Sequence, residues 1–237
     1  MNLPKILCLH GEGTSSEILR IQTSTLAASI PQFNFHYLNA PFPSPAGPGV
    51  LPFFEGPYYT WVRASSLTSK SDITIVRTLL QKTIAEHKFV GVLAFSQGGR
   101  VAAGLLRDEV LGKGLRFGIF LSCTYPPLCL QRECGVCYSS ALRIGIRDKE
   151  GKRPELGRDE HGGDGKAVIH VPSLHVHGSR DPFLRFNRLL LGRCFDGDLA
   201  WLVETEEGHR VTADRETVEI IRSAVLCMWD EIESQLN

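Results

Sequence analysis

Short apolar runs alternate along this chain with longer segments whose apolar residues recur at helical spacing. Runs without polar alternation are typical of strands buried on both faces, and the segments between them are long enough to form crossover helices. The six runs cover residues 5–10, 33–38, 89–95, 116–122, 173–176 and 199–204. This alternation predicts an α/β fold, with a mostly parallel central sheet flanked by helices on both faces.

Helical periodicity is clearest in three segments: residues 72–88, the segment that follows Ser96, and residues 214–236. The last of these places five apolar side chains on one face, namely Val218, Ile221, Val225, Trp229 and Ile232. Residues 41–57 are rich in proline and glycine, so we expect no regular element there.

Composition limits the class of protein. The chain has 237 residues, of which 43% are hydrophobic and 22% charged, so we expect one globular domain spanning residues 1–237. The 26 basic residues balance the 26 acidic ones, which disfavours nucleic acid or an anionic membrane as partner. No apolar run reaches the roughly 18 residues of a membrane span, and the first residues lack the apolar core of a signal peptide. Together with an odd number of cysteines, this predicts a cytoplasmic protein.

One stretch departs from this pattern, because twelve of the twenty residues 147–166 are charged and Leu156 is their only aliphatic side chain. Such a composition cannot offset the entropy lost on ordering. We therefore expect a mobile charged loop at 147–166 within a lid or insertion at 125–170, with a dispensable insertion as the alternative.

The run at residues 89–95 leads directly into Ala94-Phe-Ser96-Gln-Gly98, where a strand is expected to meet a helix. This is the context of a nucleophile elbow, in which small residues on both sides let the chain turn sharply around an exposed serine. Ala94 stands where the motif has glycine, which adds one methyl group. By itself the pentapeptide is a weak signal, and Ser96 could simply cap the helix.

Partners for this serine follow in a meaningful order. Asp181 lies in a turn after the apolar run that begins at residue 173, and His209 lies in a loop after the run at 199–204. The carboxyl ends of parallel strands share one edge of the sheet, so Ser96, Asp181 and His209 should meet there as nucleophile, acid and base. Asp181 before a proline could instead be only a turn former, and His209 only a surface residue.

The first strand ends in His10-Gly-Glu12-Gly, a turn whose main-chain amide at Glu12 could join the amide of Gln97 as an oxyanion hole. His10 is expected to support this turn through hydrogen bonds. No metal or organic cofactor is expected, because these side chains and amides already provide a nucleophile, a base and oxyanion donors.

Three segments then resemble a known family: residues 9–15, residues 94–98 and the long Val171-Pro-Ser-Leu-His-Val-His-Gly-Ser-Arg-Asp-Pro182 element. They are similar to the small α/β-hydrolase-fold serine hydrolases that include the human ovarian-cancer-associated hydrolase and are abundant in fungi. The resemblance spans nearly the whole chain, through His209. It implies that Tyr58, Tyr59 and Trp61 belong to a substrate-side loop, where they line an acyl pocket or form plain core.

The resemblance also implies a function. Fungal members are often encoded with polyketide synthases and act in trans as thioesterases, releasing an acyl chain from an acyl carrier protein by hydrolysis or lactone formation. Human-type members act as esterases on medium to long acyl chains. The substrate is thus expected to be a small acyl compound, with a general carboxylesterase or a non-catalytic ligand-binding protein as the alternatives.

Two further patterns have a simpler interpretation. His175 and His177 lie on one face of a strand, where a metal pair is conceivable, but without a third ligand we favour packing. Cys134 and Cys137 have a spacing used in zinc and redox sites, but the second pair of a structural zinc site is missing, so we favour ordinary thiols in a loop.

Overall fold

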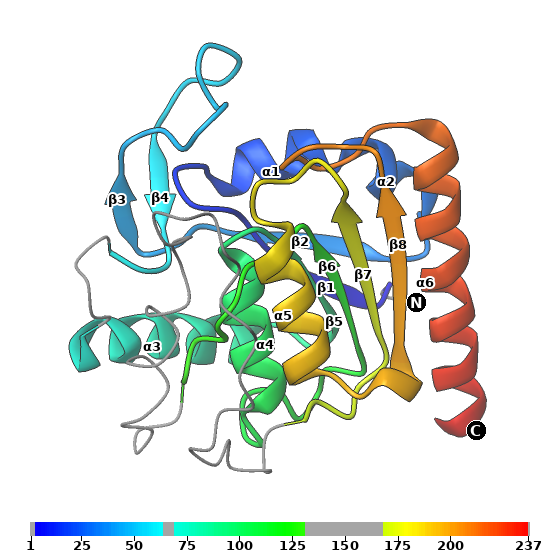
Figure 1. The fold of residues 1–237 in the computed structure, drawn as a ribbon. Coiled ribbons are helices and arrows are strands. Elements are labelled where there is room, and N and C mark those ends of the chain that lie inside the picture. Colours follow the sequence, from blue (N-terminus) through cyan, green and yellow to red (C-terminus); the bar gives the residue numbers. More distant parts are fainter. Residues whose placement is uncertain (1–2, 64–68, 131–167, 237) are drawn as a thin grey trace, which may run out of the picture.

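The computed structural model describes residues 3–63, 69–130 and 168–236 (Figure 1). Six parallel strands form one sheet in the order β2-β1-β5-β6-β7-β8. The strands are β1 Lys5–Leu9, β2 Asn34–Leu38, β5 Phe89–Phe95, β6 Phe117–Leu121, β7 Ser173–Gly178 and β8 Ala200–Thr205. All six expected strands are present, with β7 two residues longer than predicted.

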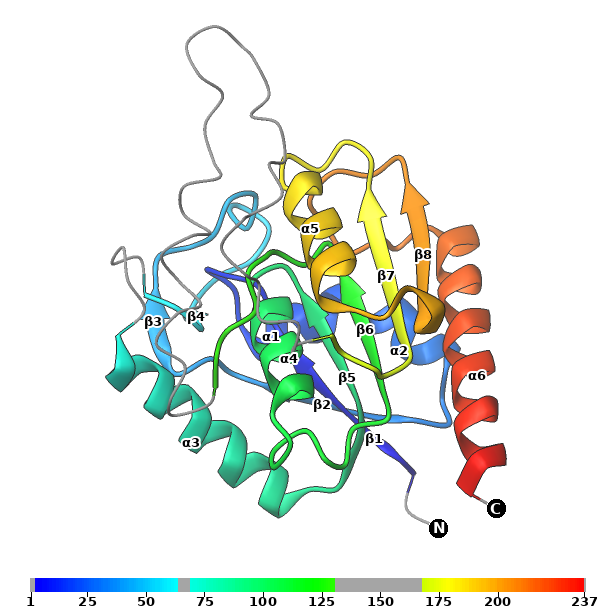
Figure 2. The same cartoon turned by 60° about the horizontal axis from the view of Figure 1, so that its bottom comes forward.

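Helices cover both faces of this sheet, as predicted (Figures 1 and 2). The helices are α1 Ser16–Gln22, α2 Ser24–Ser29, α3 Lys70–Glu86, α4 Gly98–Arg107, α5 Leu184–Cys194 and α6 Arg215–Leu236, with a short 3₁₀ turn, η2, at Gly197–Leu199. Helices α3, α4 and α5 share one apolar cluster with the sheet, and α1, α2 and α6 share the other. The apolar face expected on the last helix packs into the second cluster, with Val225 fully buried and Trp229 against it.

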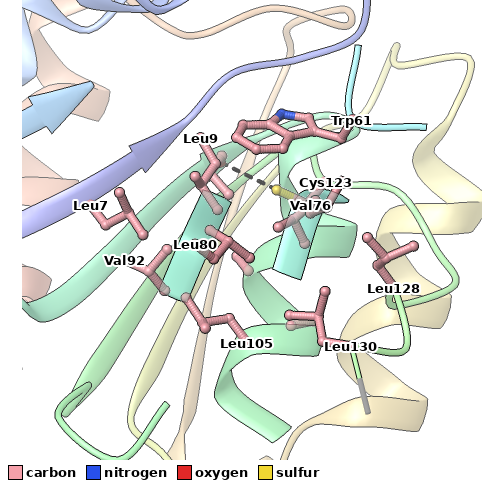
Figure 3. Packing of buried hydrophobic residues seen from close by; sticks show 14 of the residues in the cluster. Leu7, Leu9, Trp61, Val76, Leu80, Val92, Leu105, Cys123, Leu128 and Leu130 are labelled. Carbon is pink, nitrogen blue, oxygen red and sulfur yellow. Dashed lines mark hydrogen bonds between the residues drawn. The ribbon is translucent and has the colours of Figure 1, made fainter. Parts of the chain in front are cut away.

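The larger part of the core lies under α3 and α4 (Figure 3). Leu7 and Val92 project from β1 and β5 toward Leu80 of α3 and Leu105 of α4, and all four are fully buried. Trp61 closes the same cluster near the carboxyl ends of the strands. This packing fixes the strand ends that carry the candidate catalytic residues.

The expectation of no regular element at residues 41–57 was wrong. Strand β3, Phe42–Ser44, pairs antiparallel with β4, Tyr58–Thr60, and Pro43 lies opposite Tyr59. Proline is tolerated because β3 has a partner on one side only, so the missing N–H removes no bond from a second neighbour. This ribbon is attached to the end of β1 through the main-chain bond from Gly13 N to Tyr59 O, 3.0 Å.

Residues 131–167, which include most of the expected insertion and its charged loop at 147–166, lie outside the described residues. The chain on both sides of them is packed into the core, since Leu128, Leu130 and Ile169 are almost fully buried. None of the described helices combines the length and the apolar character that a membrane span requires.

Candidate active site

Ser96 lies at the junction of β5 and α4, in a left-handed backbone conformation with a φ of 51°. A non-glycine residue is strained there, so the surroundings must hold it in place. Its N–H donates to Leu121 O at 3.2 Å, and its carbonyl accepts from Gly99 N at 3.1 Å. A Cβ on Gly98 would lie 2.2 Å from Leu9 O, so the elbow can approach β1 only with glycine at this position. Ala94 is accommodated within the core, fully buried.

The three residues predicted to meet at the strand ends do so. His209 Nε2 lies 2.8 Å from Ser96 Oγ, and His209 Nδ1 lies 2.8 Å from Asp181 Oδ2. An acceptor carboxylate at Nδ1 keeps the imidazole proton there, which leaves Nε2 free to accept the serine proton. The Asp181 carboxylate is fully buried, whereas the imidazole is 21% exposed. This is the hydrogen-bond order required of nucleophile, base and acid.

Each partner is oriented by its own loop. The second oxygen of Asp181 accepts the main-chain N–H of Phe183 at 2.7 Å, so the carboxylate cannot turn away. The ring of Phe183 meets the His209 imidazole edge to face, with 4.8 Å between the ring centroids. The ring of Phe95 also contacts this imidazole, with 5.2 Å between the ring centroids. Neither aromatic residue was predicted at the site, although Phe183 follows the Asp-Pro turn by one residue.

The loops that carry acid and base are also joined to each other. Arg180 N donates to Glu207 O at 3.0 Å, and Ser179 N donates to Thr205 O at 2.7 Å. A Cβ on Gly178 would lie 2.4 Å from Glu207 O, so the two loops can approach this closely only because Gly178 has no side chain. These main-chain contacts therefore fix the two loops that bring Asp181 and His209 within 2.8 Å of each other.

The turn expected to supply the oxyanion hole is held by His10. Its Nε2 accepts the N–H of Ala40 at 2.9 Å, so its proton is on Nδ1, which donates to Gly11 O at 2.7 Å. Burial lowers the pKa of His10 to about 4, so the ring is neutral at physiological pH. Of the hydrogen bonds between described residues, none uses the main-chain N–H of Glu12 or Gln97.

Sequence reasoning missed the side chain of Gln97, which is buried beside these amides. Its Oε1 accepts the main-chain N–H of Trp61 at 2.8 Å, and its Nε2 donates to Glu12 Oε2 at 3.2 Å. These contacts join residues 36 and 85 positions apart, and no local pattern signals them.

The three residues suggested for an acyl pocket have different environments. Trp61 is fully buried and donates from Nε1 to His10 O at 2.8 Å, which places it in the core. Tyr58 and Tyr59 are half-buried. The Tyr58 hydroxyl donates to Phe54 O at 2.8 Å, and Tyr59 packs against the core cluster. Of the two alternatives, plain core therefore describes Trp61.

His175 and His177 are both buried, and the contacts of His175 support packing as its role. The His175 ring stacks on Phe120 at 4.9 Å and 9°, and meets Phe195 edge to face. Burial, followed by the nearby His177, lowers the pKa of His175 to about 3. Within the described ranges, no group of three or more His, Cys, Asp or Glu side chains is arranged to hold a metal ion. Cys134 and Cys137 lie outside those ranges.

Known proteins are similar to this chain in sequence. A family model described as serine hydrolase (FSH1) matches residues 1–221. Thioesterase FSL2 of Gibberella zeae is 32% identical, with 98% of this chain and 95% of that protein covered. Probable esterase azaC of Aspergillus niger is 31% identical, with 95% and 85% covered.

Solved structures extend the likeness to the fold. A carboxylesterase from Mesorhizobium loti superposes with a TM-score of 0.57 at 14% identity, covering 95% of this chain and 90% of the other. ClbQ from the colibactin NRPS/PKS pathway gives a TM-score of 0.54 at 15% identity, covering 96% and 98%. At these identities the likeness concerns the fold alone. Together with the parallel sheet covered on both faces, it identifies the α/β-hydrolase fold that the sequence predicts.

Proposed function

The chain belongs to the serine hydrolase (FSH1) family, and from this premise we propose that it cleaves acyl thioesters through an acyl intermediate on Ser96. The observation that carries the proposal is the hydrogen-bond chain from Ser96 Oγ through His209 to the buried Asp181, with both distances 2.8 Å. A ligand-binding protein does not require a strained serine that is hydrogen-bonded to a base. Nucleophilic catalysis requires both.

In the proposed first step, Ser96 Oγ attacks the acyl carbonyl carbon while His209 Nε2 takes the hydroxyl proton. The imidazolium that forms is stabilised by the Asp181 carboxylate at Nδ1. Collapse of the tetrahedral intermediate breaks the bond to sulfur, and the thiol leaves with the proton returned by His209. Ser96 then carries the acyl group as an ester.

In the second step, water or a hydroxyl of the acyl chain attacks the acyl-serine while His209 takes its proton. The bond from the acyl carbon to Ser96 Oγ then breaks, and the serine oxygen takes the proton back from His209. Attack by water gives a free acid, and attack by an internal hydroxyl gives a lactone. In both steps the main-chain amides of Glu12 and Gln97 are assigned to the developing oxyanion. Removing a single donor of this kind costs about 3–4 kcal/mol of transition-state stabilisation.

A carrier-bound polyketide thioester is the substrate we favour. Support comes from the related thioesterase FSL2 and from the resemblance to fungal members that release acyl chains from a carrier protein, while ClbQ from the colibactin NRPS/PKS pathway shares the fold. The second candidate is a general carboxylesterase, favoured by the related probable esterase azaC.

The test compares a medium-chain acyl thioester with the matched oxoester. Intact-mass spectrometry after brief mixing follows the acyl-enzyme, and released acid, lactone and thiol are measured alongside. We expect an adduct on the wild type but not on Ser96→Ala, with faster release from the thioester. Faster turnover of the oxoester would favour the carboxylesterase. No adduct and no product from either substrate would favour a ligand-binding protein.

A further inference from the structure

The side chain of Gln97 connects three separate segments around the elbow. Its Oε1 accepts the N–H of Trp61, at the end of β4, and Thr60 Oγ1 lies 3.0 Å from the same oxygen. Its Nε2 donates to the carboxylate of Glu12, in the loop after β1. Gln97 itself precedes α4 and is 6% exposed. One buried amide therefore fixes the ribbon, the first loop and the elbow relative to one another.

The same contacts close a ring of bonds. Trp61 donates its main-chain N–H to Gln97 Oε1 and its indole Nε1–H to His10 O, and His10 precedes the loop that holds Glu12. Glu12 completes the ring through its carboxylate to Gln97 Nε2. The two main-chain amides assigned to the oxyanion thus belong to two residues whose side chains bind each other.

Because the Glu12 side chain is charged, the orientation of the Gln97 side-chain amide affects where that charge lies. The Glu12 side chain is an exposed carboxylate, and it belongs to the turn assigned above to the oxyanion hole. A carboxylate left without a fixed donor could rotate toward that anion and oppose it. The N–H of Gln97 Nε2 holds the carboxylate at 3.2 Å in a charge-assisted bond.

We propose that the Gln97 side chain is a positioning residue, which sets the separation of the Glu12 and Gln97 amides and holds the Glu12 carboxylate aside. The proposal rests on the acyl-transfer function proposed above, and it concerns a side chain to which that mechanism gives no role. Loss of the bond should lower transition-state stabilisation and leave substrate binding largely unchanged.

Three variants separate position from charge. Gln97→Glu keeps the oxygen that accepts from Trp61 but places a second carboxylate against Glu12, so the pair carries two negative charges. Gln97→Met has a side chain of similar length that forms no hydrogen bond to Trp61 or Glu12. The pair of residues 12 and 97 then keeps the single charge of Glu12. The double variant Glu12→Gln/Gln97→Glu reverses the amide–carboxylate bond and restores a single charge. Gln81→Glu, at an exposed position on α3, is the matched control for the substitution itself.

Three quantities are measured: kcat and KM for an acyl thioester, the inhibition constant of a trifluoromethyl ketone of matched chain length, and the melting temperature. The ketone adds to a catalytic serine as a tetrahedral oxyanion, so its affinity reports on the oxyanion hole. We expect kcat to fall about 10- to 100-fold in both single Gln97 variants, with KM changed less than about threefold. Ketone affinity should fall in parallel, and the double variant should recover most of both losses.

Other results would overturn the proposal. Single Gln97 variants that lose melting temperature but keep kcat and ketone affinity would show a purely structural side chain. A loss in Gln97→Glu alone, with Gln97→Met near the wild type, would show an effect of charge without positioning. If the Gln97 variants turn over the thioester as fast as the wild type, only this inference fails. A wild type that neither turns over nor binds the ketone would overturn the acyl-transfer function and this inference with it.

Discussion

Asp181 holds the ring of His209 through one carboxylate oxygen while its other oxygen is bound to the main chain. Oδ2 lies 2.8 Å from Nδ1 of the imidazole, and Oδ1 accepts the N–H of Phe183 at 2.7 Å. The carboxylate thus has a single orientation, and the orientation determines which imidazole nitrogen carries the proton. A change of charge at this position without a change of shape should act on the tautomer alone.

Asp181→Asn tests this relationship. The amide oxygen should stay on the N–H of Phe183, which turns the NH₂ group toward His209 Nδ1. Two N–H donors cannot form a hydrogen bond with each other, so the imidazole proton moves to Nε2. That nitrogen can then no longer accept the proton of Ser96. We expect kcat to fall by roughly 10⁴-fold with little change in the melting temperature. A loss of less than tenfold in steady-state assays would contradict the role assigned to Asp181.

Gly98→Ala tests the close approach of the elbow to β1. The added methyl would lie 2.2 Å from Leu9 O and 2.8 Å from His10 O, both main-chain atoms that cannot give way without moving the strand. We expect a loss of about 1–3 kcal/mol in the free energy of unfolding, together with reduced turnover. Urea denaturation measures the first and thioester hydrolysis the second.

Gly192→Ala is the control for that change. Gly192 lies in α5, and a Cβ there meets nothing within 4 Å. Alanine should raise the free energy of unfolding by up to about 1 kcal/mol, because it has the higher helix propensity. Equal losses in the two alanine variants would mean that crowding at the elbow is not the cause.

Trp61→Phe distinguishes a core residue from one that lines a pocket. The indole is fully buried, and its loss leaves the carbonyl of His10 without the donor it now has. An unsatisfied buried acceptor costs about 1–3 kcal/mol, so the melting temperature should fall. The preference among acyl chains of different length should stay the same. A changed chain-length preference at unchanged stability would assign Trp61 to the substrate pocket.

Buried histidines predict how stability depends on pH. Burial lowers the pKa of His10 to about 4 and that of His175 to about 3, against about 6.5 when unfolded. At a pH between the folded and the unfolded pKa values, the unfolded chain binds more protons than the folded chain. The free energy of unfolding therefore decreases as pH falls from 7 to 5. The loss is of order 2 kcal/mol for each histidine.

His175→Phe checks that estimate by urea denaturation at pH 7 and pH 5. Phenylalanine can keep the stack on Phe120 but binds no proton, so the difference between the two pH values should shrink by about 2 kcal/mol. An unchanged difference would show that His175 makes no contribution to the acid sensitivity.

The parallel sheet and the meeting of the three candidate residues follow from features that the sequence displays directly. Apolar runs without alternation predicted the six strands, and the order of Ser96, Asp181 and His209 at their carboxyl ends predicted one shared edge. The meeting of the three side chains could be expected because parallel strands share one carboxyl edge, whereas the two 2.8 Å hydrogen bonds are seen only in the structure.

Other features could not be predicted because their causes are tertiary or too short. Helices α1 and α2 have seven and six residues, less than the window in which helical periodicity can be detected. Helix α5 begins at Leu184 without a side-chain cap, and Gly192 weakens its pattern. The role of the Gln97 side chain depends on Glu12 and Trp61, which are brought to it only by the folded sheet.

The central claim is that Ser96 is an activated nucleophile. Its most direct test is intact-mass spectrometry of the wild type and Ser96→Ala after reaction with a fluorophosphonate, followed by peptide mapping of the adduct. The account predicts one phosphonyl group on the wild type, located on Ser96, and none on the folded variant. A wild type that stays unmodified, or a Ser96→Ala protein that is labelled as fast, would contradict it.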